Sequence, residues 1–158
     1  MTNALVTHYF EDLKVGMSGS FAKTLSEADV EAYAGITGDF NPLHVNREYA
    51  EQTMFKHRIV HGLLCAGLIS SALGDRLPGP GAIYLSQTLD FIAPVAFEDT
   101  VTATVTVKEL QPEHHHVVMI TVCTVGDKIV ISGEALLKVQ SRISSRGRQT
   151  TTHALASA

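Results

Sequence analysis

The chain has 158 residues, a mass of 17.0 kDa and a hydrophobic fraction of 45%, which suits one folded domain with a substantial apolar core. Its formal net charge of −4 gives no overall attraction for nucleic acid or an anionic membrane, so neither is an expected partner. The N-terminus lacks a signal-peptide pattern and the longest apolar stretch, residues 59–73, is shorter than a ~20-residue membrane span, so we expect a soluble, cytoplasmic protein.

The first part of the chain predicts one strand followed by one helix. Residues 10–25 suit a lead-in and a strand. Ser26 with Asp29 three positions later is the pattern of a capping box, which marks a helix N-terminus. Either Gly35 or Gly38 can end this helix, because glycine readily adopts the left-handed conformation common after a helix.

Two further helices are predicted before the middle of the chain. Residues 47–53 suit a short helix. Residues 63–75 are apolar on every face, which predicts a longer helix that is buried all round. Many of its side chains are small, so neighbouring backbone can approach closely, as a sheet curling around the helix would require.

The second half of the chain is rich in Val, Ile and Thr, which favours strands. In the run TVTATVTV the alternation places valines on one face and threonines on the other. Gly126-Asp127 predicts a tight hairpin between the last two strands. The expected strands cover residues 83–92, 100–110, 116–125 and 128–139. Helices followed by consecutive strands predict an α+β fold, with an antiparallel β-sheet wrapped on a buried central α-helix.

Only one domain is expected, and it covers residues 1–140. No internal repeat or second domain is visible in the sequence. Residues 141–158 have lost all periodicity and are polar and mildly basic, so we expect them to form a disordered tail.

Asp39 and His44 stand in the segment GDFNPLH, where Pro42 fixes its own φ and keeps Asn41 out of helical geometry. Such a stiff turn can present a carboxylate and an imidazole at one opening, close enough to share a water molecule. This pair suits general acid–base catalysis, because imidazole titrates near neutrality and a carboxylate accepts protons. Spacing alone favours a structural alternative, in which Asp39 caps a turn and His44 is an exposed polar residue.

Gly62 follows His61 at the start of the predicted buried helix. The first N–H groups of a helix lack intrahelical partners and carry partial positive charge. The Gly62 N–H is therefore a candidate donor to a substrate oxygen that becomes negative during a reaction. The alternative, favoured by the glycine alone, is that Gly62 merely permits tight helix packing.

The segments DFNPLHVN and RIVHGLLCAGLISSALGDRLPGPGAIYLSQTLDFIAPV resemble the MaoC-like hydratases, specifically the short bacterial (R)-specific enoyl-CoA hydratases. The resemblance covers roughly residues 13–139, and its two motifs, DFNPLH and IVHG, are specific to this family. It implies a single hot-dog domain. It also implies that the enzyme hydrates a trans-2-enoyl-CoA thioester to the (R)-3-hydroxyacyl-CoA, with Asp39 and His44 as the acid–base pair.

The resemblance further implies roles for three other residues. Asn41 matches a polar residue that helps shape the water site, and Gly62 matches the position whose amide binds the thioester oxygen. Ser70 matches a helix residue that orients the surroundings of the catalytic aspartate. The family forms homodimers, so a homodimer is expected, and no cofactor or metal is required.

Three alternative functions remain open at this point. A (3R)-hydroxyacyl-acyl-carrier-protein dehydratase catalyses the same reaction in reverse, so residues cannot separate it from a hydratase. A hot-dog thioesterase is disfavoured because residues 63–74 contain no acidic side chain. A non-catalytic acyl-CoA-binding module would need no Asp/His pair. The acyl chain length and the pathway, including polyhydroxyalkanoate precursor supply, stay open.

A basic run precedes the predicted buried helix. Lys56, His57 and Arg58 can meet the phosphates of coenzyme A. A solvated loop explains the same three residues equally well, so this run does not identify the carrier.

Overall fold

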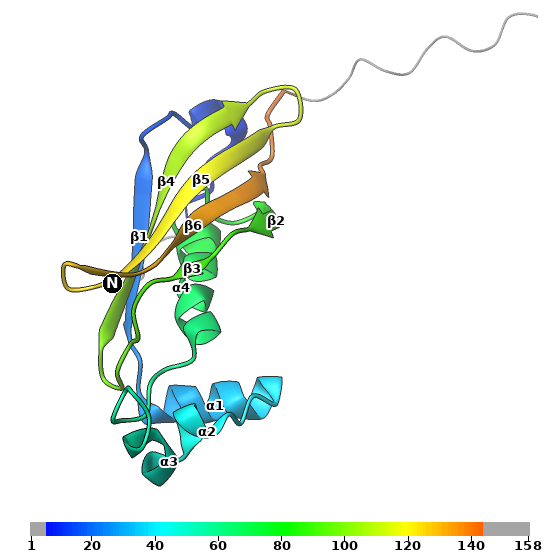
Figure 1. Cartoon of the computed structure of the whole chain (residues 1–158). Helices are drawn as coiled ribbons and strands as arrows, with labels where there is room; N and C mark the ends of the chain where they lie inside the picture. The colour runs from blue at the N-terminus through cyan, green and yellow to red at the C-terminus, as the bar shows by residue number, and fades with distance from the viewer. Residues whose placement is uncertain (1–5, 144–158) are drawn as a thin grey trace, which may run out of the picture.

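An antiparallel sheet curved against one helix makes up most of the structure (Figure 1). The computed structural model describes residues 6–143. The elements are η1 (Phe10–Asp12), β1 (Ser18–Thr24), α1 (Glu27–Thr37), α2 (Pro42–Val45), α3 (Arg47–Glu51), α4 (Gly62–Asp75), β2 (Ile83–Gln87), β3 (Asp90–Phe91), β4 (Thr100–Gln111), β5 (His116–Val125) and β6 (Lys128–Lys138). Among the described residues, no helix combines the length and the apolar character needed to cross a membrane.

The sheet follows from the hydrophobic alternation of its long strands. Its strands lie in the order β1-β4-β5-β6-β2, with β3 pairing β6, and the pairs are antiparallel. In β4, Val101, Ala103 and Val105 are fully buried, whereas the intervening threonines are partly exposed, as predicted. Gly126 adopts a positive φ of 55° in the tight turn between β5 and β6, which is the predicted hairpin.

Helix α1 begins and ends where the sequence indicates. Ser26 caps it, and a reciprocal capping box joins the side chains and backbones of Ser26 and Asp29. Gly38, not Gly35, terminates the helix in the left-handed conformation at φ 79°. A side chain at that position would be strained, so the end of α1 is fixed one residue before Asp39.

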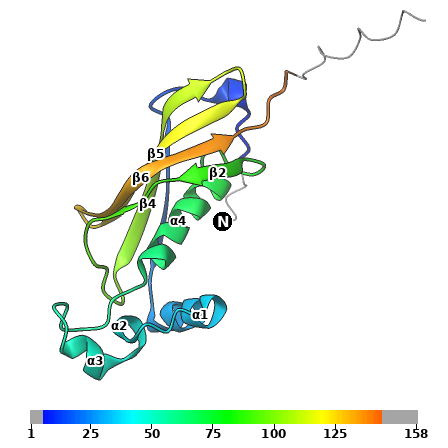
Figure 2. The ribbon, with the colours of Figure 1, turned by 45° about the vertical axis from the view of Figure 1, so that its right-hand side comes forward.

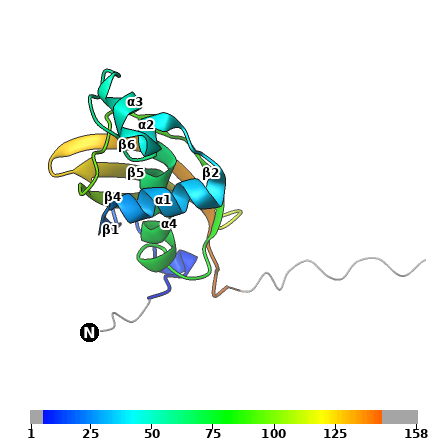
Figure 3. The ribbon, with the colours of Figure 1, turned by 90° about the horizontal axis from the view of Figure 1, so that it is seen from below.

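Helices α1, α2 and α3 gather at the end of the sheet where α4 begins, as two views related by rotation agree (Figures 2 and 3). Helix α4 runs from this end along one face of the sheet. Its buried residues, which pack against the sheet, are Cys65, Leu68, Ile69, Ala72 and Leu73. The N-terminus of α4 therefore lies beside the segment that contains Asp39 and His44.

Three local expectations are corrected by the structure. The strand expected over residues 83–92 is divided into β2 and β3, with a register shift between Tyr84 and Ser86. The stiff turn expected around Pro42 contains the four-residue helix α2, because proline is pre-organised for the first helical position and Asn41 caps it. Helix α4 is not buried all round, because the sheet covers only one of its faces.

The uncovered face of α4 is a continuous line of residues. It consists of Leu63, Gly67, Ser70 and Gly74, all of which are exposed. Their spacing of four, three and four residues places them on one side of a helix. The face is exposed in a single chain because no described element of that chain packs there.

Residues 141–143 belong to the described part of the chain and contact its N-terminal segment. The guanidinium of Arg142 donates two hydrogen bonds to the Asp12 carboxylate, both at 2.7 Å, and stacks over the Tyr9 ring. The Arg142 backbone N–H and the Ser141 hydroxyl both donate to Glu11. The rest of the expected tail, residues 144–158, lies outside the described residues.

Candidate active site

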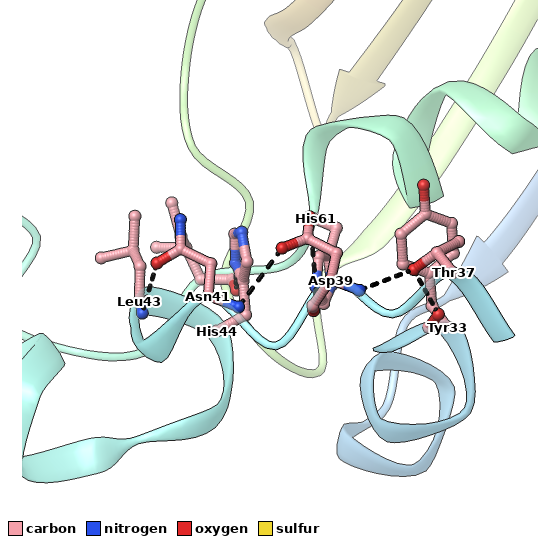
Figure 4. A network of polar contacts seen from close by, with 8 residues as sticks. Tyr33, Thr37, Asp39, Asn41, Leu43, His44 and His61 are labelled. Carbon is pink, nitrogen blue, oxygen red and sulfur yellow. Dashed lines mark hydrogen bonds and ion pairs between the residues drawn. The ribbon is translucent and has the colours of Figure 1, made fainter. Parts of the chain in front are cut away.

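Asp39 stands in the loop between α1 and α2, where backbone hydrogen bonds orient it. Its N–H donates to the Thr37 hydroxyl at 3.3 Å, and its carboxylate oxygen Oδ1 accepts from the Asn41 N–H at 3.2 Å (Figure 4). The side chain is half exposed. The Asp39 carboxylate thus takes part in a turn, as the structural alternative expected, yet one oxygen, Oδ2, remains turned toward the histidines.

His44 is buried, which contradicts the alternative of an exposed polar residue. It lies in α2, and its Nδ1 is 2.8 Å from the Ile59 carbonyl oxygen. A carbonyl can only accept, so Nδ1 carries the hydrogen and Nε2 holds the lone pair in the neutral ring. Burial lowers the pKa of His44 below 6.5; His61 lowers it further, while the bond to Ile59 and the Asp39 charge oppose the shift. His44 is therefore held in its neutral, proton-accepting form.

His61 is a third member of the site, and the sequence motifs predict no role for it. It is 2% exposed, and its ring stacks on that of His44 with 3.8 Å between centroids. Its Nε2 lies 3.0 Å from the Asp39 carbonyl oxygen and 3.9 Å from Asp39 Oδ2. The sequence shows a histidine before a helix-initial glycine, but nothing local distinguishes an inward ring from a solvated one.

Asp39, His44 and His61 bring one carboxylate oxygen and two imidazole nitrogens within 4.8 Å of one another. Such a set has the composition of a transition-metal site. His61 Nε2, however, lies 3.0 Å from the Asp39 carbonyl oxygen, which can only accept, so this nitrogen carries a hydrogen and offers no lone pair to an ion. Binding an ion through this nitrogen would require the hydrogen bond to break, so the arrangement suits a water molecule better than a metal.

An apolar cavity of about 540 Å³ opens beside the two catalytic candidates. Apolar and aromatic side chains form most of its wall. Its lining includes Asp39, His44, His61, Gly62, Phe55, Cys65, Phe91 and Ile131. A carboxylate and an imidazole at the edge of an apolar cavity can act on a polar group attached to a hydrocarbon chain.

Gly62 is the first residue of α4 and lines the cavity. In this position its N–H has no intrahelical acceptor. A β-carbon placed on Gly62 would lie 2.7 Å from the Phe91 ring, so the space above the backbone is already filled by an aromatic edge. The packing alternative and the oxyanion role thus both find a structural basis here.

Asn41 and Ser70 are not brought into this cavity. The side-chain oxygen of Asn41 accepts from the Leu43 N–H at 3.1 Å and so caps α2. Asn41 thereby shapes the turn between Asp39 and His44 without lining the cavity itself. Ser70 lies about two helical turns beyond Gly62, on the exposed face of α4.

A second cavity of about 380 Å³ lies beside residues 56–58. Its wall is basic, with one acidic residue. It is lined by Arg47, Glu51, Lys56, His57, Arg58, Ala96 and Phe97. Arg58 is already paired with Glu27 and stacked 4.8 Å from the Phe97 ring centroid, so Arg47 and Lys56 remain as the other cations of this wall.

The family model described as the MaoC like domain matches residues 14–128, a span that includes Asp39, His44 and the residues 59–62. The chain belongs to the MaoC-like domain family. Two curated relatives of this MaoC-like protein are similar over most of their lengths. An (R)-specific enoyl-CoA hydratase of Rhodospirillum rubrum is 58% identical, covering 87% of this chain and 96% of the relative. A 3-hydroxybutyryl-CoA dehydratase of Methylorubrum extorquens is 52% identical, covering 85% of each.

A solved structure confirms the hot-dog architecture of this MaoC-like chain. The (R)-hydratase from Aeromonas caviae involved in polyhydroxyalkanoate biosynthesis is 41% identical, with a TM-score of 0.79. The match covers 82% of this chain and 98% of the neighbour. The resemblance in the sequence and the predicted fold class are therefore both confirmed.

Proposed function

We propose that this enzyme adds water to a trans-2-enoyl-CoA and forms the (R)-3-hydroxyacyl-CoA. The observation that carries the proposal is the pairing of Asp39 and His44 at the edge of an apolar cavity, beside Gly62, whose N–H belongs to the first residue of α4. The (R)-specific enoyl-CoA hydratase and 3-hydroxybutyryl-CoA dehydratase relatives support the same reaction, read in either direction.

The proposed chemistry uses one water molecule held between Asp39 and His44. The Nε2 lone pair of His44 takes a proton from this water as its oxygen bonds to C3 of the enoyl group. The resulting imidazolium, stabilised by the Asp39 carboxylate, gives that proton to C2. Both additions occur on one face of the substrate, because one site supplies the hydroxyl group and the proton.

In the proposed mechanism, Gly62 stabilises the charge that develops on the substrate. As water adds to C3, electron density moves to the thioester oxygen, which becomes an enolate. A helix-initial N–H aimed at this oxygen stabilises the charge without any side chain. The apolar cavity holds the acyl chain, and no step needs a metal or a cofactor.

The direct test of this function is hydration of crotonyl-CoA by the purified protein. Loss of the enoyl-thioester absorbance, with chiral analysis showing the (R)-3-hydroxy product, is the expected result. An (S) product, or hydrolysis that releases free coenzyme A, would refute the proposal and favour a different hot-dog activity. Parallel assays with crotonyl-acyl carrier protein identify the carrier, and a strong preference for it would favour the dehydratase alternative.

We further propose that the enzyme is a homodimer formed through the exposed face of α4 and the β2 edge of the sheet. Strand β2 ends the sheet order and exposes large apolar side chains, including Ile83, Tyr84 and Leu85. An unpaired apolar edge beside an uncovered helix face is suited to a second copy of the chain. Such a dimer would bury Ser70 and bring it near the partner's elements.

Light scattering tests this assembly, with a dimer of about twice 17.0 kDa as the expected species. Replacement of Leu85 by Lys in the β2 edge should weaken the dimer. The matched control is Lys replacing Ile120, which is similarly exposed but lies on β5. An active wild-type monomer would contradict the proposal.

We also propose a cytoplasmic location. Both cysteines, Cys65 and Cys123, are buried and free, and a reducing compartment keeps thiols in that form. Fractionation of cells producing the protein tests this, since its recovery with secreted proteins would exclude the cytoplasm.

A further inference from the structure

His61 is a buried histidine that the proposed chemistry does not use. It occupies the N-cap position of α4 without a side-chain capping bond, is 2% exposed and contacts two other rings. The His44 ring stacks on it at 3.8 Å, and the Tyr33 ring packs at 4.8 Å with a tilt of 49° (Figure 4). A ring so enclosed restricts the positions that the neighbouring His44 and Tyr33 rings can take.

The hydrogen bond of His61 defines its tautomer. The Asp39 carbonyl oxygen can only accept, so His61 Nε2 carries the hydrogen and donates at 3.0 Å. This bond joins the N-terminus of α4 to the loop between α1 and α2. The backbone of Asp39 is thereby held against the helix that begins with Gly62.

The same short segment also holds His44. The Ile59 carbonyl, two residues before His61, accepts the His44 Nδ1 hydrogen at 2.8 Å. Val60, between them, donates its N–H to the Val95 carbonyl at 2.9 Å, which anchors the segment to the body of the protein. Residues 59–61 thus hold both catalytic candidates and lead directly into Gly62.

The other nitrogen of His61 argues against a packing role alone. Nδ1 is buried and has no hydrogen-bond partner among the described residues. An unsatisfied buried acceptor lowers stability, and an apolar ring of similar size would avoid that loss. A histidine at this position is therefore explained by its Nε2–H bond to Asp39 and not by stability.

We propose that His61 is a positioning residue, which holds the Asp39 carboxylate and the His44 imidazole in register with the Gly62 amide. This inference rests on the proposed hydration reaction. His61 acts through its bond to the Asp39 backbone and its stack on His44. Release of the bond allows the Asp39 loop to move away from α4 while the fold stays intact.

The test compares His61→Phe with His61→Gln in steady-state hydration of crotonyl-CoA. Phenylalanine keeps the ring and its stack but removes the donor, whereas glutamine offers an amide N–H at a similar reach. We expect kcat of His61→Phe to fall by roughly 10–10²-fold, the scale of a misplacement of about 1 Å, with KM changed by less than about 3-fold. Its melting temperature should equal or exceed that of the wild type.

His61→Gln is the conservative variant, and it should recover most of the lost kcat. A folded His61→Phe enzyme with wild-type kcat would overturn the proposal. A folded His61→Gln enzyme as slow as His61→Phe would also overturn it, since the donor would then have no effect. A wild-type protein that fails to hydrate crotonyl-CoA is a separate result, which refutes the proposed function itself.

His61→Leu serves as a second apolar variant if phenylalanine does not fit between Tyr33 and His44. The same split is expected, with kcat reduced, KM nearly unchanged and glutamine again restoring activity. Failure of both apolar variants to fold would contradict the proposal, because it would show that the histidine is required for packing.

Discussion

Strand β4 and the segment from Asp39 to Gly62 differ in the kind of side chain that they bury. In β4, every buried position is apolar, and fully buried Val101 and Val105 alternate with partly exposed threonines. In the other region, two histidines are buried and His61 Nδ1 has no partner among the described residues. Lys56 in that region also adopts a positive φ of 62°, a conformation that favours glycine.

The difference shows where the chain gains stability and where it loses some of it. Alternating apolar residues in the sheet lower the free energy of folding by removing hydrocarbon from water. Buried imidazoles and strained backbone oppose folding and persist only where the surrounding structure holds them. Substitutions in the segment from Asp39 to Gly62 should therefore change catalysis, whereas substitutions in the sheet should change stability.

The largest expected effect is on catalysis, at Asp39 and His44. Asp39→Asn and His44→Gln should each lower kcat by roughly 10²–10⁴-fold, because each removes a group that transfers or stabilises a proton. KM should change much less. Thermal unfolding serves as the control, and both variants should melt close to the wild type. Near wild-type hydration by either variant would exclude the pair from the chemistry.

In the sheet, we expect a substitution to lower stability and to leave kcat unchanged. Met119→Ala in β5 removes a fully buried side chain and should lower the free energy of unfolding by about 2–5 kcal/mol. The neighbouring Ile120→Ala is the matched control, since Ile120 is 42% exposed on the opposite face and should cost much less. Urea unfolding measures both changes. Below its melting temperature, Met119→Ala should keep the wild-type kcat, and a selective loss of kcat would break the comparison.

Gly62 has two proposed roles, stabilisation of the enolate charge and close packing. Two Gly62 substitutions compared in one Phe91→Ala enzyme separate these roles. In a Phe91→Ala enzyme the ring that meets a β-carbon at Gly62 is gone. Gly62→Ala and Gly62→Pro can then be compared, because alanine keeps the N–H and proline deletes it. Proline is tolerated in the first turn of a helix. We expect the proline variant to be roughly 10²-fold slower than the alanine variant, the scale for one oxyanion donor.

The outcome decides between charge stabilisation and packing. Equal kcat values for the folded proline and alanine variants would show that the thioester oxygen is held elsewhere. Melting temperatures of both variants in the Phe91→Ala background provide the stability control.

The smallest expected effect is the pH dependence that His44 introduces. Burial first, and then His61, lower its pKa below 6.5, so the folded protein keeps the neutral ring as pH falls through 6.5. The unfolded chain takes up the proton first, so this group makes stability decrease as pH falls from 6.5 toward the lowered pKa. The acid limb of kcat/KM should likewise lie below pH 6.5.

Titration of His44 by NMR checks this directly. Asp39→Asn removes a charge that raises the His44 pKa, so the variant should titrate at a still lower pH than the wild type. A wild-type midpoint above 6.5 would contradict the expected direction.

Much of the fold could be predicted because its signals are local. The capping box at Ser26, the alternation in β4 and the hairpin at Gly126 each depend on residues only a few positions apart. Short-range patterns of this kind indicate the type of element without reference to tertiary contacts. The family motifs similarly indicated Asp39, His44 and Gly62, and the structure brings these three to one cavity.

The sequence by itself determined the order of helices and strands, the buried face of the sheet and the family. Only the tertiary structure decided the hydrogen-bond partner of His61, the division of β2 from β3 and the exposed face of α4. Each of these depends on a group far away in the chain, such as the Asp39 carbonyl that His61 meets across 22 positions. Hydrophobic periodicity in the sequence indicates which side chains are buried. The partner of a buried polar atom is determined only when distant segments pack together.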